Sequence, residues 1–263
     1  MAIYLKKFET MSQYNAYTAD TENFILPNVS LTVDNSTVHY NPSSPVPPTP
    51  SHDYVEIGGV KWATMNVGAN SITDTGLYFQ WGDTQGYTAA QVGEGEGKKY
   101  FGWADYKYGN GTSEPGTTGM TKYNATDGKI TLEPTDDAVT VAWGGGWRMP
   151  RDSEFAALGE AIDFIDSSGT TITASDKLTT LSGVTGILVA DKNDHSKRLF
   201  FPAAGNCSKG NIKLVDSFGY YWSSSLNTYV IRANILSLSS SFVNWKYGND
   251  RYGGYSVRGV LDE

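Results

Sequence analysis

The chain has 263 residues and carries 28 Asp and Glu against 20 Lys and Arg, a formal net charge of -8 at pH 7. Such a chain is long enough to bury a sizeable core in one large domain or two small ones. Its negative charge would repel nucleic-acid phosphates and anionic lipids, and no apolar stretch is long enough to span a membrane, so nucleic acid and membranes are poor candidate partners. Residues 1–20 contain no apolar run typical of a signal peptide, so we expect a cytosolic product unless a leader has been removed.

The composition favours a loop-rich domain with β-structure over a helical bundle. Aromatic residues make up 13% of the chain, charged residues make up 18%, and there are 29 glycines. Cys207 is the single cysteine, which excludes an intramolecular disulfide and a multi-cysteine metal site. Stability must therefore come from packing.

The clearest boundary is the stretch NPSSPVPPTP, residues 41–50, which predicts a stiff, extended linker over residues 41–52. Before it, residues 24–40 alternate apolar and polar side chains and predict one or two short strands. We interpret residues 1–40 as an attachment or oligomerisation segment, while an extra strand packed on the main domain is an equally good interpretation. Residues 53–263 would form that main domain.

The main domain starts with a predicted hairpin over residues 54–65, with Gly58-Gly59 at its turn. Residues 66–128 are rich in Gly, Tyr and Asp, and we expect little regular structure there. Interspersed aromatic side chains should hold these loops on the domain. They are Tyr78, Trp81, Tyr87, Trp103, Tyr106 and Tyr108.

A first helix is predicted in residues 134–143, PTDDAVTVAW, with Thr135 as its N-cap. Asp136 and Asp137 would then lie near the positive end of the helix dipole. As an alternative, this acidic pair could act as acid and base or hold a cation, but adjacent aspartates at a helix start are more often first-turn residues.

A second helix is predicted in residues 150–165, where Phe155, Leu158, Ile162 and Ile165 recur at helical spacing. Beyond it, short apolar runs bounded by Gly, Asp and Asn favour strands within residues 186–190, 198–205 and 219–261. The order of strands, loops, two helices and further strands predicts an α+β domain.

Signals of enzymatic chemistry are weak. His39, His52 and His195 lie beside no Ser or Cys in a recognisable nucleophile arrangement. The GEGEG stretch at residues 93–97 lacks the spacing of a dinucleotide site, and residues 191–196 lack the closing Glu of an EF-hand loop. We therefore expect no catalytic residues, no cofactor and no metal site.

Several unusual strings occur in one order along residues 54–261. The most specific are GGGWRMP at residues 144–150 and YWSSS at residues 221–225. In the sequence and the order of these strings, this part resembles the Fibrobacter major paralogous domain and the related variable proteins of diversity-generating retroelements, found in bacteria and gut-associated phages. The resemblance implies a C-type lectin-like fold of the formylglycine-generating-enzyme kind, with a small antiparallel sheet, two helices and extensive loops. It also implies that the hairpin at 54–65 pairs with a strand at 256–261.

One departure from the family concerns the start of the second helix. Relatives often have Thr at the position of Arg151, where it forms a capping box with Glu154. Because the hydroxyl is missing here, we expect the helix to start at Asp152 or Ser153.

Two activities known for this fold are not expected. An oxidising enzyme of the fold uses two cysteines near its C-terminus, and this chain has one. Calcium-dependent sugar binders carry the motifs Glu-Pro-Asn or Gln-Pro-Asp and Trp-Asn-Asp, whereas this chain has Glu133-Pro134-Thr135 and Asn244-Trp245-Lys246.

For the C-terminal residues 219–261, the resemblance implies a variable region. In such proteins adenine-directed mutagenesis rewrites Asn codons to codons for Tyr, Ile, Val, Ser, Arg, Asp, Gly or Phe, and the new side chains form a solvent-facing binding surface. The implied framework is residues 222–225, Ala233, Leu236, Leu238, Val243, Trp245, Arg251 and residues 256–260. The candidate ligand-binding positions, each reachable from such a codon, are Tyr229, Val230, Ile231, Arg232, Ile235, Ser237, Ser239, Ser241, Tyr247, Asn249, Asp250, Tyr252 and Tyr255.

Alternation along a strand assigns these residues to two faces. Leu236 and Leu238 would lie on one face, and Ile235, Ser237 and Ser239 on the other. We expect the second face to contact the ligand.

The expected function is non-enzymatic binding of a protein or glycan receptor on a bacterial surface. The chain would act in a phage virion, near the tail tip, since virion proteins assemble in the cytosol. The alternative is an adhesin or structural module of a bacterial cell surface with the same fold. Ordinary exposed loops without diversification remain a further interpretation, and either a trimer or a monomer is compatible with the family.

Overall fold

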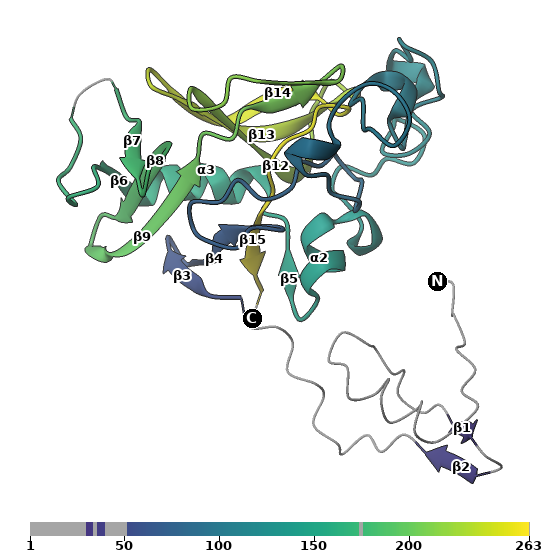
Figure 1. The fold of residues 1–263 in the computed structure, drawn as a ribbon, viewed down its shortest axis with the longest axis horizontal. Coiled ribbons are helices and arrows are strands. Elements are labelled where there is room, and N and C mark those ends of the chain that lie inside the picture. The colour runs from purple at the N-terminus through teal and green to yellow at the C-terminus, as the bar shows by residue number, and fades with distance from the viewer. Residues whose placement is uncertain (1–29, 34–35, 40–51, 174–175, 263) are drawn as a thin grey trace. The chain divides into compact units, whose positions relative to one another are not determined.

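The computed structural model describes residues 30–33, 36–39, 52–173 and 176–262 (Figure 1). The chain divides into two compact units, Met1–Ser51 and His52–Glu263. In the first unit, β1 (Ser30–Val33) and β2 (Ser36–His39) form an antiparallel pair. The short strands predicted before the linker are thus confirmed, whereas the predicted linker, apart from His52, lies outside the described residues.

The second unit is mostly β-structure, with several small antiparallel sheets and two short helices in its described part. Its first sheet joins the two ends of the unit in the order β3-β4-β15-β5. The strands are β3 (Tyr54–Ile57), β4 (Val60–Asn66), β15 (Arg258–Leu261) and β5 (Trp147–Arg148).

The predicted hairpin is confirmed, and the C-terminal strand β15 pairs with β4, with Val260 opposite Trp62. Gly58 and Gly59 have φ angles of 63° and 76°, a conformation that suits glycine at a tight turn. Both Trp62 and Val260 are fully buried, so the pairing of the first and last strands of the second unit forms part of its core.

The first helix is preceded by a 3-10 turn. This turn, η4, spans Pro134–Asp136, and α2 then spans Ala138–Trp143. The expected N-cap Thr135 is wrong: the Oδ1 atom of Asp137 accepts the N–H groups of Val139 and Thr140, both at 2.9 Å. Pro134 starts the 3-10 turn, and the helix therefore begins two residues later than the sequence pattern suggested.

The second helix, α3, spans Asp152–Ala161, which confirms the expected start at Asp152. The Glu154 carboxylate accepts the N–H of Arg151 at 2.6 Å, so half of a capping box persists without the hydroxyl. The predicted continuation of the helix to residue 165 is wrong, because Ile162–Ile165 form strand β6. These β-branched and aromatic side chains pair with a neighbouring strand instead.

The second sheet is built around a long central strand, β8, which pairs with β6, β7 and β9. The additional strands are β7 (Thr179–Leu181), β8 (Val184–Asp191) and β9 (Asp194–Pro202), followed by the hairpin β10 (Asn206–Ser208) and β11 (Asn211–Lys213). The strands predicted within residues 186–190 and 198–205 are confirmed.

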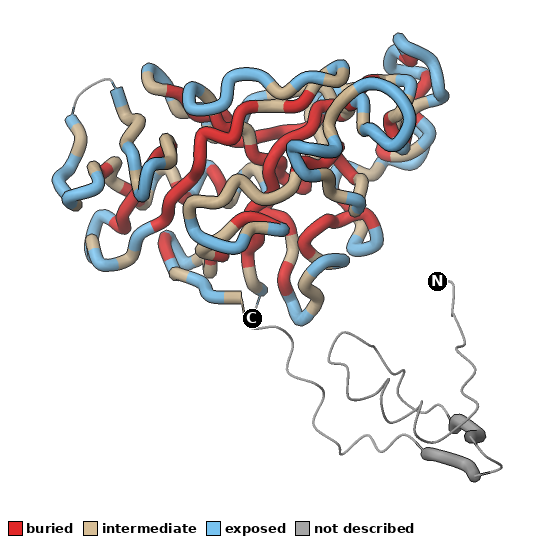
Figure 2. The backbone as a smooth tube through the Cα atoms, in the orientation of Figure 1, coloured by how far each residue is buried: buried red, intermediate tan, exposed pale blue. Residues whose placement is uncertain are grey.

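The third sheet carries the C-terminal segment in the order β12-β13-β14. Its strands are β12 (Phe218–Leu226), β13 (Arg232–Ser239) and β14 (Val243–Asp250). Leu236 and Leu238 pack into a core cluster with Phe155 of α3, whereas Ile235 packs into another cluster with Trp81. The central strand is therefore buried on both faces along most of its length (Figure 2).

The central segment, residues 66–128, contains little regular structure, as predicted. Its described elements are three 3-10 turns, η1 (Ala89–Gln91), η2 (Trp103–Asp105) and η3 (Thr117–Gly119). Tyr78, Trp81 and Tyr106 are buried and hold these loops on the domain. Across the described ranges, no helix is long and apolar enough to span a membrane.

Candidate ligand-binding surface

The candidate positions fall into an exposed group and a buried group. Tyr229 is 50% exposed and Tyr247 is 49% exposed, and Arg232 and Ser241 are also exposed. A partly buried group completes this surface: Val230, Ile231, Asn249, Asp250 and Tyr252. The structure brings most of these residues together at the β12–β13 connection and along the edge strand β14.

Four expected contact residues are buried: Ile235, Ser237, Ser239 and Tyr255 are each at most 4% exposed. The predicted alternation of β13 is correct, but the expectation that its second face meets solvent is wrong. The chain returns across this face after β14, and the ring of Tyr255 lies 4.5 Å from that of Trp222, centroid to centroid.

The serines on this face stand beside larger side chains of β12. Ser237 is opposite Tyr220, and Ser239 is opposite Phe218. Small side chains between large ones are readily covered, which accounts for their burial.

Tyr247 shows how position in the sheet decides exposure. It lies directly across from Ile235 in the β13–β14 register, so both side chains point to the same face. Ile235 is on the central strand and fully buried, whereas Tyr247 is on the edge strand and half-exposed. A β-bulge in β14 between Asn244 and Tyr247 also breaks the regular alternation. The register shifts there, because Ile235 lies opposite Tyr247 whereas Ser237 lies opposite Asn244.

The connection between β12 and β13 has a fixed backbone. The Asn227 side chain accepts the N–H of Tyr229 at 3.0 Å and donates to the Oδ1 atom of buried Asn234 at 2.6 Å. Asn234 in turn donates to the Asp152 carboxylate at the start of α3, at 2.8 Å. The chain of hydrogen bonds anchors the loop to the helix, while the side chains of Tyr229 and Arg232 stay exposed.

Arg251 anchors the same loop through its buried side chain. Its guanidinium is fully buried and donates to the Val230 carbonyl at 2.9 Å. It also donates to the carbonyls of Lys122 and Tyr123, each at 2.9 Å, and to the Tyr106 hydroxyl at 2.8 Å. One side chain thus joins the C-terminal segment to the central segment.

Two exposed or partly exposed aromatic residues beside this surface were not among the predicted contact residues. Phe242, in the β13–β14 turn, is 45% exposed, and Phe is among the residues that an altered Asn codon can encode, so that signal could have identified it. Trp103, on η2, packs against Tyr252 with ring centroids 4.9 Å apart. Nothing local in the sequence indicates this long-range contact.

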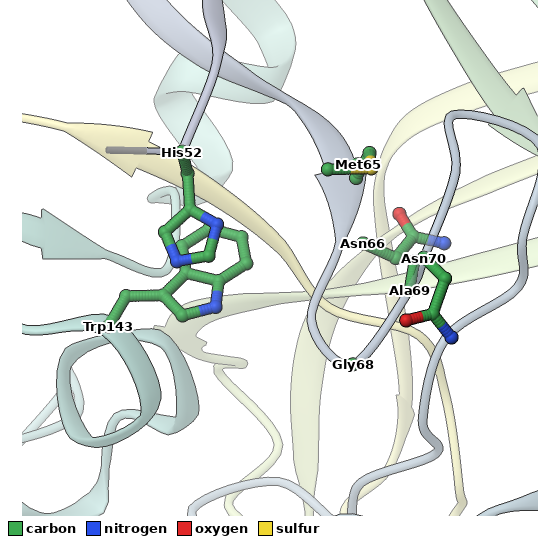
Figure 3. Close-up of a pocket in the computed structure, with 7 residues that line it drawn as sticks. All are labelled: His52, Met65, Asn66, Gly68, Ala69, Asn70 and Trp143. Carbon is green, nitrogen blue, oxygen red and sulfur yellow. The ribbon is translucent and has the colours of Figure 1, made fainter. Parts of the chain in front are cut away.

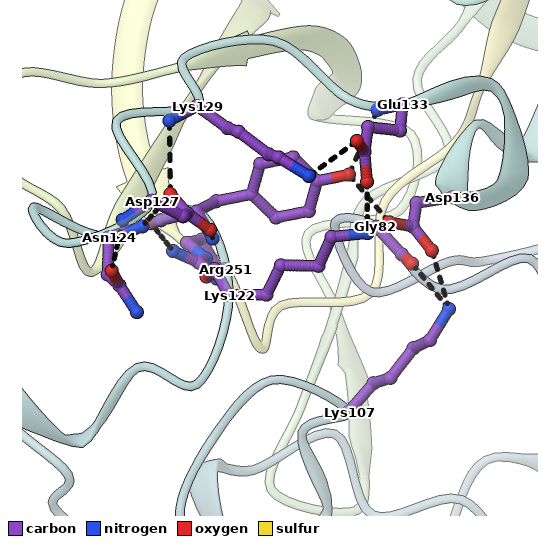
Figure 4. Close-up of polar contacts among 10 residues, drawn as sticks. Gly82, Lys107, Lys122, Asn124, Asp127, Lys129, Glu133, Asp136 and Arg251 are labelled. Carbon is purple, nitrogen blue, oxygen red and sulfur yellow. Dashed lines mark hydrogen bonds and ion pairs between the residues drawn. The ribbon is translucent and has the colours of Figure 1, made fainter.

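A polar network joins the central segment to η4 (Figure 4). The Asp136 carboxylate is 5% exposed and accepts hydrogen bonds from Lys122, from the Tyr123 hydroxyl at 2.6 Å and from Lys107 at 3.2 Å. Lys122 also pairs with Glu133 at 2.6 Å. Burial alone raises the pKa of Asp136, but the hydrogen bonds, led by that from Lys122, outweigh burial and hold the pKa well below its ordinary value.

Replacing Asp136 by asparagine is expected to lower the free energy of unfolding at pH 7 by about 2–3 kcal/mol. Because the pKa of Asp136 is lower in the folded chain than in the unfolded chain, its stabilisation is present above the unfolded pKa of about 4 and lost as the pH falls further. Urea denaturation between pH 7 and pH 2.5 should show a steeper acid loss for the original chain than for the variant. Equal slopes would contradict the role of Asp136, and the exposed Glu96→Gln variant serves as control.

His52 and His195, the two histidines of the second unit, belong to other clusters. The His52 ring stacks on Trp143 with centroids 3.9 Å apart, and both residues line a pocket of about 210 Å³ together with Met65 and Asn70 (Figure 3). His195 pairs with Asp163 at 3.0 Å. Within the described ranges, no group of three His, Cys, Asp or Glu side chains is placed to hold a metal ion.

Comparisons with models of protein families, with characterised proteins and with solved structures each found no match to this chain. The arrangement of the C-terminal segment and the sequence resemblance of residues 54–261 are therefore the basis for a functional proposal.

Proposed function

We propose that this chain is a non-enzymatic ligand-binding protein whose C-terminal surface is diversified by a retroelement, and that it serves as a receptor-binding protein at a phage tail tip. The observation that carries the proposal is the division within residues 219–261. Trp222, Leu236 and Arg251 are fully or almost fully buried, whereas Tyr229 and Tyr247 on neighbouring backbone are half-exposed. A fixed frame with replaceable exposed side chains is what diversification without unfolding requires.

A C-type lectin-like fold of the formylglycine-generating-enzyme kind is part of the proposal. It is supported by the pairing of β15 with β4 near the two ends of the second unit. Two short helices and the long irregular central segment agree with the same fold. The family resemblance of residues 54–261 supplies the remaining support.

The proposed contact residues are the exposed and partly exposed members of the candidate set, together with Phe242. Tyrosine offers a large, stiff contact area and a hydroxyl at low entropic cost, as in antibody paratopes. The Arg232 guanidinium lies 5.6 Å from the Tyr229 ring and pairs with Asp250 at 3.3 Å, so the surface offers charge and aromatic area side by side. We infer a receptor on a bacterial surface as the ligand.

The genome that encodes the chain provides the direct test. We expect a reverse transcriptase gene and a near-copy of the sequence for residues 219–261 nearby, with Asn codons at the exposed positions Tyr229, Arg232 and Tyr247. Sequencing of the locus and of passaged populations should show differences confined to adenines of that copy. A neighbourhood of cell-envelope genes without a reverse transcriptase would contradict the proposal and favour a bacterial surface adhesin.

A further inference from the structure

Trp103 is presented by a rigid turn of the central segment. The Asp105 carboxylate accepts the N–H groups of Phe101 at 3.1 Å and Gly102 at 2.6 Å, and it pairs with Lys99 at 3.2 Å. These contacts close the η2 turn around a single carboxylate. The Trp103 side chain remains partly exposed, so its position is fixed while part of its ring meets solvent.

The turn is joined to the C-terminal segment at Tyr252. The buried Gln80 amide donates to Asp105 at 3.3 Å and to the Tyr252 carbonyl at 3.2 Å. The rings of Trp103 and Tyr252 meet at 4.9 Å and 69°, and Tyr252 is also partly exposed. Two partly exposed aromatic rings from distant parts of the chain therefore form one corner.

This corner borders the candidate contact residues. Tyr252 directly follows Arg251, whose side chain holds the Val230 carbonyl and whose backbone N–H donates to the Ile231 carbonyl at 3.1 Å. Asp250, on the other side of Arg251, pairs with Arg232. The central segment and the variable region thus meet along a seam at residues 250–252.

We propose that Trp103 is a fixed contact residue of the ligand-binding surface, and that the ligand lies across the seam between the central segment and the variable region. The inference rests on the proposed function. Tryptophan cannot arise from an altered Asn codon and Trp103 lies outside the variable region, so it would be shared by all variants. Trp, Tyr and Arg are the residues that most often dominate protein interfaces.

The side chains of the seam favour a protein partner. Trp103, Tyr252 and Arg232 belong to the three residue types that contribute most often to hot spots of protein–protein interfaces. Trp103 and Tyr252 are both partly exposed where their rings meet. The occupant is therefore a folded protein that covers these two rings.

The test uses a display library of the full chain varied at Tyr229, Arg232, Tyr247, Asn249 and Asp250, selected separately against lysozyme and against an immobilised branched glycan. We expect lysozyme-binding clones whose Kd rises at least about tenfold on Trp103→Ser and is partly restored by Trp103→Phe. Tyr54→Ser is the matched control, because Tyr54 is 49% exposed and lies in β3, which belongs to a different sheet from β12, β13 and β14. Urea denaturation of every variant establishes that it is folded.

The outcomes separate the two proposals. Folded libraries that yield no binders to either probe would overturn the proposed function and this inference together. Binders whose affinity is unchanged by Trp103→Ser would overturn this inference and leave the proposed function supported. Trp103-dependent binders to the glycan alone would overturn the assignment of a protein partner.

Discussion

Replacing Ile235 by asparagine is expected to lower the free energy of unfolding by about 3–5 kcal/mol, whereas replacing Tyr247 by asparagine is expected to cost less than about 1 kcal/mol. The two residues are direct neighbours across β13 and β14. Ile235 is fully buried in the core with Trp81 and Trp222, so asparagine leaves a cavity and buries an amide. Tyr247 is half-exposed on the edge strand, and an amide there stays hydrated.

Urea denaturation of both variants measures this difference with one substitution at two paired positions. Asparagine is also the residue that the proposed template would encode, so the experiment asks which positions tolerate the starting residue of diversification. Similar losses at both positions would contradict the division of residues 219–261 into frame and contact residues. A Ser241→Asn variant, exposed in the β13–β14 turn, provides a second tolerant control.

Replacing Arg251 by methionine is expected to lower the free energy of unfolding by about 3–5 kcal/mol. The guanidinium satisfies three backbone carbonyls and the Tyr106 hydroxyl in a site without solvent exposure. It also lies 5.0 Å from the ring of Trp81, a favourable cation–π distance. Methionine fills part of the volume but leaves those oxygen acceptors without their donor.

The loss of stability in the Arg251→Met variant should be accompanied by more frequent local opening of the two loops that Arg251 joins. Hydrogen exchange is expected to accelerate at residues 227–231 and 120–124, since Arg251 joins these two loops. Arg232→Met is the matched control, because Arg232 is exposed and its pair with Asp250 should contribute less than about 1 kcal/mol. Unchanged exchange in both loops would contradict the anchoring role of Arg251.

Local sequence rules predicted most of the elements. Gly58-Gly59 marked the hairpin, the helical spacing of Phe155 and Leu158 marked α3, and the alternation of Leu236 and Leu238 with Ile235 marked the two faces of β13. These rules failed at the start of the first helix and at the end of the second. Pro134 favoured a 3-10 turn that moved the cap from Thr135 to Asp137, and pairing with β8 made a strand of Ile162–Ile165.

By itself, the sequence determined the hairpin, the approximate places of the helices and most strands, and which side chains of a strand share a face, because these depend on neighbouring residues and on the geometry of the backbone. The tertiary structure alone decided which of those faces meets solvent. Tyr255 returns over Trp222 to cover one face of the sheet, and Trp103 arrives beside Tyr252 from a distant loop. Burial is set by such contacts between segments far apart in the chain, and a local pattern carries no record of them.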